Sequence, residues 1–459
     1  MLLLLLAVLI GAAVFYGILQ LEIPGLWQFV LVVIEMATLS QFMVKRYGFQ
    51  SEMGLVLLKS TRGVDIIESL AKNERLLNVI ADIGAAMSYG LLSFALMRKN
   101  ASPATAAIGL VLLAVILVFA APVAFALLLQ SIRGGEMGGS VSAVSDNPDI
   151  GFWAIAAVVL IGGLFLFILM GIIFYGIVVF RALVLSVFFG TPDIGNTAAG
   201  GTFLIPGVNL PLVEGIFALA IVMIVHEGAH AILARVARVP ILSSGIVLFG
   251  ILPVGAFVEP DEKKLASVDG KRQTRVLVAG PTANLITALL FFLAFMGFFY
   301  TTAGFREEGL LVTSGLESVS EGQTVIYAIA GERIDPASID IANFSGFNLP
   351  KNSEVELLTN KGAVLRETDA NGKMGITFTV LRKDSLFAVY SVPFLGFIYT
   401  ILGLSIALNF VVGAVNILPI PLFDGYRIID VNIKNKTIVK ALSYTALFFF
   451  ILNFLPHLF

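Results

Sequence analysis

The fold of this chain is decided by residues 213–236, which read VEGIFALAIVMIVHEGAHAILARV. An apolar run of about 18–25 residues is long enough to cross the hydrocarbon core of a bilayer as a helix. The run therefore predicts a membrane-spanning helix. Within this run lie three ionisable side chains at close spacing, those of His226, Glu227 and His230. The chain must cross a membrane and also accommodate these polar groups within it.

The composition of the whole chain is typical of a membrane protein. Of its 459 residues, 58% are hydrophobic and 13% are charged, whereas a soluble domain has about 45–50% apolar and about 25% charged residues. The formal net charge is −2 and there is no long basic run, so no nucleic-acid partner is expected. The absence of cysteine excludes disulfides, cysteine-ligated zinc and a cysteine nucleophile.

Further apolar runs predict an α-helical polytopic membrane protein. We expect about nine transmembrane helices, at 1–20, 27–43, 78–98, 104–130, 152–180, 213–236, 276–300, 395–417 and 438–457. The stretch 44–77 mixes basic residues with short apolar runs, which indicates an amphipathic segment lying on the membrane surface.

A small soluble domain is predicted between two of these helices, at 306–392. Apolar and polar residues alternate in 324–329 and 376–381, and turn residues occur at 369–372, a pattern typical of a β-rich domain. The segment 321–334 resembles a PDZ domain, in which a similar apolar strand leads into a glycine-containing turn. A generic β-rich spacer is the alternative.

The predicted domains follow from this order. They are the N-terminal helices 1–200, the first part of a catalytic membrane core 201–305, the PDZ-like insert 306–392 and the second part of the core 393–459. Basic residues gather in 44–77, 237–275 and 425–437, and short loops rich in Lys and Arg remain in the cytoplasm. Nine spans then place the net-acidic insert on the extracytoplasmic side of the cell membrane.

The motif HExxH at 226–230 predicts a metal site. Residues i and i+4 share one face of a helix, so His226 and His230 can offer imidazole nitrogens to one Zn²⁺, with Glu227 beside them as a base. The same pattern occurs by chance in unrelated chains, and polar side chains in a membrane helix can also serve helix packing. Three ionisable groups at metal spacing inside an apolar run favour the metal, because isolated charges at this depth are costly.

A third metal ligand is expected, because catalytic zinc usually binds three protein side chains and a water molecule. The remaining histidine, His457, lies at the far end of the last predicted span, so a carboxylate is the better candidate. Asp424 lies in the segment 416–425, NILPIPLFDG, where Pro419 and Pro421 interrupt the helix. Irregular backbone at membrane depth is tolerated where it is buried or lines a cavity. The alternative is that Asp424 is a turn residue at the membrane interface.

Together these motifs resemble the site-2 protease family of intramembrane metalloproteases. The resemblance combines the HExxH helix, AGPTAN at 279–284 and the segment 416–425, which fits the family pattern NxxPxPxxDG with Phe423 where Leu is common. The stretch 250–262 is similar to the archaeal branch. The resemblance covers about 213–437.

The resemblance implies roles for particular residues. His226, His230 and Asp424 would bind zinc, and Glu227 would act as general base and then as general acid.

Further roles concern the substrate. Asn284 would lie near the metal, to orient the substrate or stabilise the oxyanion, and Asn416 would act in the same way. The stretch 250–259, with Gly255, would form a re-entrant hairpin that presents a strand edge to the substrate. The PDZ-like insert would select substrates by size or bind peptide chain ends.

The predicted function is therefore intramembrane zinc proteolysis of transmembrane segments in membrane-anchored substrates, with the active site nearer the cytoplasmic face. One alternative is a membrane metalloprotease of the CAAX-processing type, which takes a glutamate as third ligand and lacks the motif at 416–425. Others are a transporter, whose broken helices and ionisable residues bind ions, and a non-catalytic adaptor that presents the insert.

Overall fold

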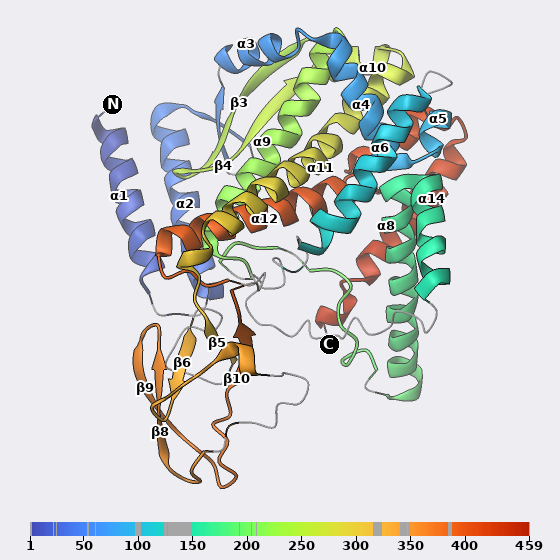
Figure 1. Cartoon of the computed structure of the whole chain (residues 1–459). Helices are drawn as coiled ribbons and strands as arrows, with labels where there is room; N and C mark the ends of the chain where they lie inside the picture. The colour runs from blue at the N-terminus through green and yellow to red at the C-terminus, as the bar shows by residue number, and fades with distance from the viewer. Residues whose placement is uncertain are drawn as a thin grey trace.

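Three helices form the centre of the structure, a computed structural model of the whole chain (Figure 1). The helix α9, Leu212–Val236, carries the HExxH motif and contacts both α11, Gly270–Thr301, and α12, Pro393–Val415, which also contact each other. The structure describes residues 2–458 except 22, 24, 53–54, 60, 97–101, 124–125, 127–147, 192, 203, 208, 315–323, 340–346, 348 and 384–387.

Within the described residues, five helices are long and apolar enough to cross a membrane. They are Pro103–Val123, Ile155–Phe189, Leu212–Val236, Gly270–Thr301 and Pro393–Val415. Each overlaps a predicted span. Helices also form at the other four predicted positions, as α1, Leu2–Leu19, α2, Gly25–Tyr47, α4, Glu74–Tyr89, and α14, Lys436–Leu452. A multi-pass membrane protein is supported, and the count of nine spans stays a prediction.

The helix α4 connects two of the N-terminal helices to the central three. This helix contacts α11, α6, Pro103–Val115, and α8, Pro148–Phe189. At the end of α4 the backbone of Gly90 passes so close to Gly163, inside α8, that a Cβ atom on Gly90 would lie 2.5 Å from the Gly163 nitrogen. Both glycines have positive φ, 54° and 59°, which residues with a Cβ rarely adopt.

A four-stranded antiparallel sheet lies against α9. Its strands are β1, Gln50–Glu52, β2, Leu55–Lys59, β3, Ile241–Phe249, and β4, Leu252–Pro260, in the order β1-β2-β3-β4. The hairpin expected at 250–259 is longer than predicted, since 250–259 supplies only its turn and most of its second strand. The Gly250 amide at the turn donates a hydrogen bond to Ser40 Oγ at 2.8 Å, which ties the hairpin to α2.

The segment 44–77, predicted to lie on the membrane surface, supplies two of these strands and the helix α3, Thr61–Leu70. Pairing of β2 with β3 leaves β4 at one edge of the sheet, with β1 at the other. The helix α3 contacts α9 and β3 and exposes the apolar side chains of Ile66 and Leu70, and its position on the membrane surface stays a prediction.

A second antiparallel sheet forms within the insert. Its strands are β5, Gly309–Ser314, β6, Val325–Ile329, β7, Glu332–Arg333, β8, Glu354–Thr359, β9, Gly362–Glu367, and β10, Thr377–Leu381. The strand order is β10-β5-β6-β8-β9, and β7 pairs with β6. The alternating segments 324–329 and 376–381 account for β6 and β10. Among the described residues of 306–392 there is no α-helix, and the likeness to a PDZ domain stays a prediction.

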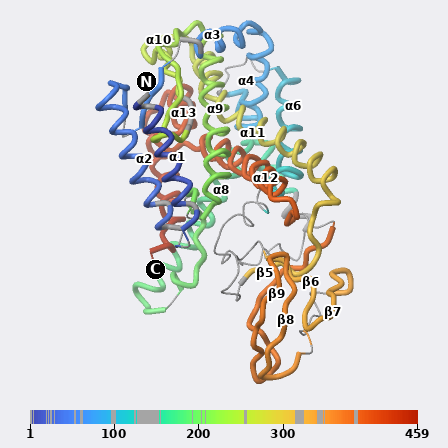
Figure 2. The backbone as a smooth tube through the Cα atoms, turned by 90° about the vertical axis from the view of Figure 1, so that its left-hand side faces the viewer, coloured from blue at the N-terminus to red at the C-terminus, as the bar shows by residue number. Residues whose placement is uncertain are grey.

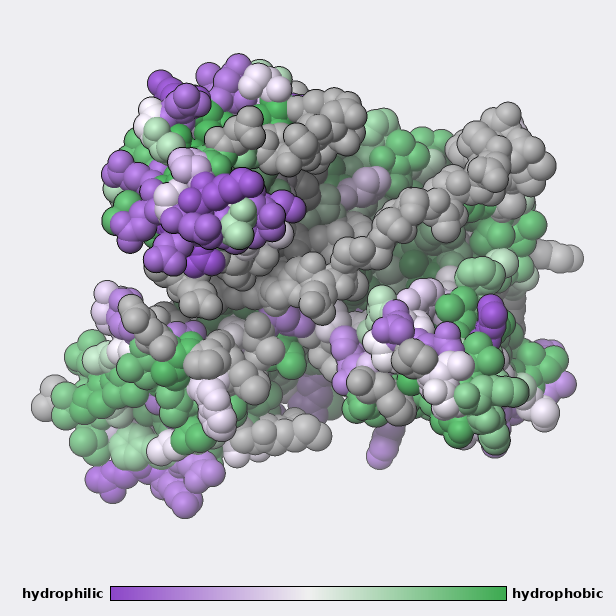
Figure 3. Space-filling model, turned by 90° about the horizontal axis from the view of Figure 1, so that it is seen from below, coloured by the Kyte–Doolittle hydropathy of each residue, from purple (hydrophilic) through white to green (hydrophobic). Residues whose placement is uncertain are grey.

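The insert and the basic loops lie at opposite ends of the molecule. Two views at right angles place the sheet of the insert at one end and α3 and α10, Glu262–Ser267, at the other (Figures 1 and 2). Seen from the end of the insert, hydrophilic side chains gather over the insert while much of the helical surface around it is hydrophobic (Figure 3). This arrangement agrees with the predicted topology, although which end faces the cytoplasm stays a prediction.

Candidate metal centre

The helix α9 brings two imidazole rings together. His226 and His230 lie one helical turn apart, as their spacing requires. Their ring centroids are 4.7 Å apart and their Nε2 atoms are 3.1 Å apart. Both side chains are largely buried, with exposed fractions of 12% and 16%.

Asp424 reaches the same point from a different part of the chain. The helix α12 ends at Val415, the segment with Pro419 and Pro421 follows in non-helical conformation, and Asp424 begins α13, Asp424–Asn432. The next residue, Gly425, donates its amide hydrogen to the Asn416 carbonyl at 2.7 Å, which closes the loop. Asp424 Oδ2 thereby lies 3.1 Å from His226 Nε2 and 3.2 Å from His230 Nε2.

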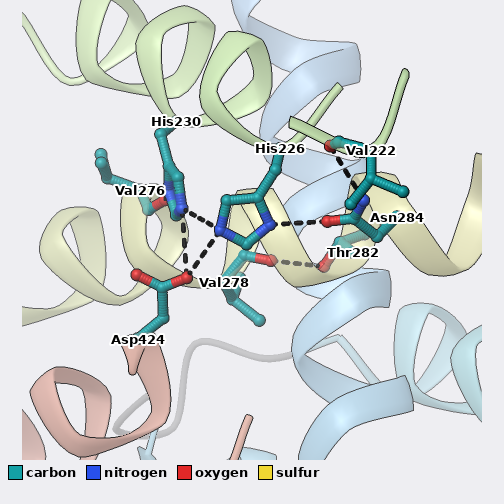
Figure 4. Close-up of polar contacts among 8 residues, drawn as sticks. All are labelled: Val222, His226, His230, Val276, Val278, Thr282, Asn284 and Asp424. Carbon is teal, nitrogen blue, oxygen red and sulfur yellow. Dashed lines mark hydrogen bonds and ion pairs between the residues drawn. The ribbon is translucent and has the colours of Figure 1, made fainter. Parts of the chain in front are cut away.

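The Nδ1 atom of each histidine points away from Asp424, and its hydrogen-bonding partner determines which nitrogen carries the hydrogen (Figure 4). His226 Nδ1 lies 2.6 Å from Asn284 Oδ1, and His230 Nδ1 lies 2.7 Å from the Val276 carbonyl oxygen. Both partners accept hydrogen bonds, so each Nδ1 carries the hydrogen and each neutral ring presents a lone pair at Nε2. Partners of this kind fix the orientation of metal-binding histidines in proteins.

Three atoms with lone pairs, His226 Nε2, His230 Nε2 and Asp424 Oδ2, therefore converge in a buried space. A cation bound between them would relieve their mutual repulsion. Zinc with bonds of about 2.0–2.1 Å in tetrahedral geometry separates its ligands by about 3.3 Å. The observed separations of 3.1–3.2 Å fit this geometry. Within the described part of the chain, these side chains form the group of histidine and carboxylate residues suited to a metal. The His₂-carboxylate donor set is one that zinc prefers.

The motif AGPTAN, at 279–284 in α11, packs directly against the two histidine rings. A Cβ atom on Gly280 would lie 2.4 Å from His230 Nε2 and 2.7 Å from His226 Nε2. Only glycine lets α11 pass this close beneath the rings. Because of this approach, the Val276 carbonyl and the Asn284 side chain, one on either side of Gly280, reach the two Nδ1 atoms.

Asn284 is fixed by its own hydrogen bonds. It is fully buried, and its Nδ2 donates to the Val222 carbonyl at 3.2 Å and to Asn409 Oδ1 at 2.8 Å. Both amide hydrogens are thus used within the protein, while the oxygen contacts His226. Asn284 thus contacts His226 of the site, and its expected role of orienting the substrate or stabilising the oxyanion stays a prediction.

Glu227 and Asn416 lie beside the metal-binding group in a cavity of about 370 Å³. The cavity is also lined by His226, His230 and Asp424. In the part of the chain that the structure describes, the Glu227 carboxylate and the side-chain amide of Asn416 have no hydrogen-bonding partner. The cavity therefore places a proton acceptor, Glu227, and a hydrogen-bond donor, Asn416, next to the group formed by His226, His230 and Asp424, which is called the metal-type site below.

Gly255, a predicted substrate-binding residue, and His457, which is not expected to be a ligand, lie elsewhere. Gly255 is in β4, paired with Val247 of β3, and its contact with a substrate stays a prediction. His457 Nε2 is 2.9 Å from the Gly201 carbonyl oxygen, to which it donates, outside the metal-binding group.

The helix α4 supports the site from the N-terminal region, and the sequence analysis did not foresee it. Arg275, the residue before Val276, forms two hydrogen bonds with Asp82, at 2.7 and 2.6 Å, and a third with Asn78 at 2.9 Å. Tyr89 donates to the Ile417 carbonyl at 3.3 Å, in the loop that leads to Asp424. The sequence contained one indication of this contact. Asp82 and Arg275 are opposite charges within or beside apolar runs, and such charges need partners when they are buried.

The fold and the site define a protein with several helices suited to cross a membrane and a buried His-His-Asp group that could bind a metal, as in metallopeptidases. The chain belongs to peptidase family M50, the site-2 protease family, whose sequence model matches residues 214–455, more than half of the chain. The predicted family is thereby confirmed. Members of this family are metallopeptidases, typically with zinc.

An uncharacterised protein of Methanocaldococcus jannaschii is 33% identical to the chain over 226 residues. The match covers 48% of this chain and 58% of that relative, so the chain spans less than two thirds of its length. No solved structure gives a significant match.

We expect the purified protein to carry about one Zn²⁺ per chain, and His226→Ala or Asp424→Ala to lose most of it. Two ligands rarely hold catalytic zinc tightly. Metal analysis of detergent-purified protein measures this, with His457→Ala as the matched control that keeps its zinc. Full occupancy in Asp424→Ala would remove that residue from the ligand set.

We expect Asp82→Asn to lower the free energy of unfolding by about 3–5 kcal/mol, because it leaves the Arg275 guanidinium buried without its counter-charge. The pair is 17% and 10% exposed. Thermal and denaturant unfolding in detergent measures the change, and Asp82→Leu combined with Arg275→Met should recover much of it. Asp430→Asn is the control, since its pair with Lys436 is solvent-exposed and contributes little. An equal effect of the two Asn variants would contradict the prediction.

Proposed function

We propose that this protein is an intramembrane zinc endopeptidase that cuts transmembrane segments of membrane-anchored proteins. The observation that carries the proposal is the convergence of three lone-pair atoms of His226, His230 and Asp424 beside a free Glu227 carboxylate. His226, Glu227 and His230 lie within α9, which is long and apolar enough to span a membrane. The M50 match adds that the chemistry is peptide hydrolysis.

The roles of the residues follow from the groups they present. Zinc, when bound, makes water a nucleophile at neutral pH and polarises the scissile carbonyl. Glu227 takes a proton from the attacking water and returns it to the leaving amine nitrogen. The side-chain amide of Asn416, which has no partner among the described residues, donates a hydrogen bond to the oxyanion. Asn284 holds the His226 ring in the tautomer that presents Nε2.

A substrate is held in extended conformation by β4. Peptide carbonyls within a substrate helix are engaged in hydrogen bonds, so the helix must unwind before it is cut. The strand β4 has an open edge, and Val258 and Pro260 of this strand line the cavity. Pairing with β4 replaces the hydrogen bonds that the substrate loses. Residues that destabilise a helix in the substrate therefore matter more than a strict cleavage sequence.

The site geometry and the family match favour this proposal over a CAAX-processing enzyme, a transporter or an adaptor. An enzyme of the CAAX-processing type takes a glutamate from a helix as third ligand, whereas Asp424 follows a proline-broken loop. A transporter or an adaptor needs neither a base beside the metal-type site nor a match to a peptidase family.

We expect Glu227→Gln to keep its zinc while turnover falls by roughly 10²–10⁴, the usual share of general acid–base catalysis. The variant keeps the shape of the side chain and leaves every ligand in place. The measurement is cleavage of a panel of membrane-anchored substrates by purified protein, with and without a chelator. Glu214→Gln, the same change near the start of the same helix, is the control. Near-normal cleavage by Glu227→Gln would mean that another residue activates the water.

We expect the cut to fall nearer the cytoplasmic end of a transmembrane substrate. His226 lies ten residues before Val236, where α9 ends, which is about 15 Å at the rise of an α-helix. Mass spectrometry of the products locates the scissile bond. Since the chain has no cysteine, Met223→Cys at the cavity wall can also be labelled with a membrane-impermeant thiol reagent. A cut near the outer end, or labelling only from outside, would contradict this topology.

We expect removal of the insert to leave zinc binding intact and to widen the range of substrates that are cut. The chain enters and leaves the insert as a paired ribbon, with the Glu307 amide bonded to the Val389 carbonyl at 2.8 Å. A short glycine linker can therefore join Glu307 to Val389. Competition between substrates with and without a bulky extracytoplasmic domain measures selectivity. An unchanged preference would make the insert a spacer.

A further inference from the structure

Leu422 adopts a backbone conformation that its side chain does not favour. Its φ is +88°, in the region that glycine or asparagine normally occupies. The Phe423 amide donates to the Ile420 carbonyl at 3.0 Å, which makes Leu422 the third residue of a tight turn after Pro421. Proline second and positive φ third are the features of a type II turn, whose third residue is usually glycine.

The strain is not offset by packing within the protein. The Leu422 side chain is fully exposed, 100%, whereas Ile420, in the same turn, is 3% exposed. The Phe423 ring packs edge-on against Phe450, with centroids 6.1 Å apart. The turn is therefore held by its neighbours, and Leu422 is the residue that it presents outward. Strained residues of this kind cluster at functional sites, where the surrounding structure enforces them.

Leu422 lines the cavity that contains the metal-type site, two residues before Asp424. The same cavity is lined by Val258 and Pro260, which lie on one face of the edge strand β4 because they are alternate residues. The cavity thus has an apolar group from the turn and apolar groups from β4, with Glu227 among its polar ones. A peptide paired with β4 would lie within reach of both.

We propose that Leu422 is a substrate-contacting residue that selects an apolar side chain next to the scissile bond. This inference rests on the proposed proteolytic function. A bound peptide buries the exposed Leu422 side chain, which gives the hydrophobic contact that the protein alone does not provide. Glycine at this position would fit the turn with less strain, yet it would lose this contact. The backbone conformation of the turn therefore favours glycine at residue 422, whereas substrate recognition favours leucine. A Leu422→Gly variant separates the two effects.

The test is Leu422→Gly in the full-length purified protein. We expect its zinc content and its melting temperature to equal or exceed those of the wild type, because glycine relieves the positive φ. We expect kcat/KM for a cleavable transmembrane substrate to fall about tenfold or more, the range over which an apolar pocket discriminates. Leu422→Met keeps an apolar side chain of similar size and should retain most of the activity.

Specificity gives the sharper readout. In substrates that carry Leu, Ala or Asp beside the mapped scissile bond, the wild type should favour Leu, and Leu422→Gly should reduce that preference. Ala330→Gly is the matched control, since Ala330 also has positive φ, 52°, but lies in a turn of the insert between β6 and β7. Its preference among the three substrates should be that of the wild type.

Two results would overturn the inference. Unchanged kcat/KM and unchanged preference in Leu422→Gly would show that the side chain takes no part in recognition. Loss of zinc in Leu422→Gly and in Leu422→Met would show that the residue acts on Asp424. Absence of cleavage by the wild type would instead contradict the proposed function, so the two failures are distinguishable.

Discussion

The structure depends on three lone-pair atoms that meet inside a largely apolar helical body. Two belong to the helix α9 and the third to Asp424 at the start of α13, 194 residues or more further along the chain. Buried atoms of this kind repel each other unless a cation lies between them, so the protein must hold them in place by other means. It does so with Asn284 and the Val276 carbonyl, which α11 brings close because Gly280 has no side chain.

The support of this site extends beyond the part of the chain that matches the peptidase family. The helix α4 lies N-terminal to the match, yet it is bonded to α11 through Arg275 and to the loop of Asp424 through Tyr89. Buried residues of α4, α11 and α13 belong to a single hydrophobic cluster. The N-terminal helices are thus part of the structure that holds the metal-type site, because both sides of that site rest on α4.

The cavity separates hydrolysis from recognition. The groups suited to bind a metal and to move a proton, those of His226, Glu227, His230 and Asp424, lie on α9 and at the start of α13, where helical geometry and the closed loop fix them. The groups suited to hold a peptide lie on the edge strand β4 and on the turn that carries Leu422. The sheet leaves β4 open because β2 covers the other side of the hairpin. A segment distant in sequence therefore determines which edge is free.

The sequence by itself determined the helical membrane class, the family, and the placement of His226 and His230 on one face of a helix. The length of apolar runs, short motifs and an i, i+4 spacing are local properties that a sequence shows directly. It also indicated Asp424, since Pro419 and Pro421 interrupt the helix in front of it. Only the tertiary structure decided the partners of Asn284, the support by Asp82 and Tyr89, and the pairing of β2 with β3. Each of these pairs residues far apart in the chain, and no local pattern specifies such a partner. The positive φ of Leu422 belongs to the same group, because the buried residues around that turn enforce it against the preference of leucine.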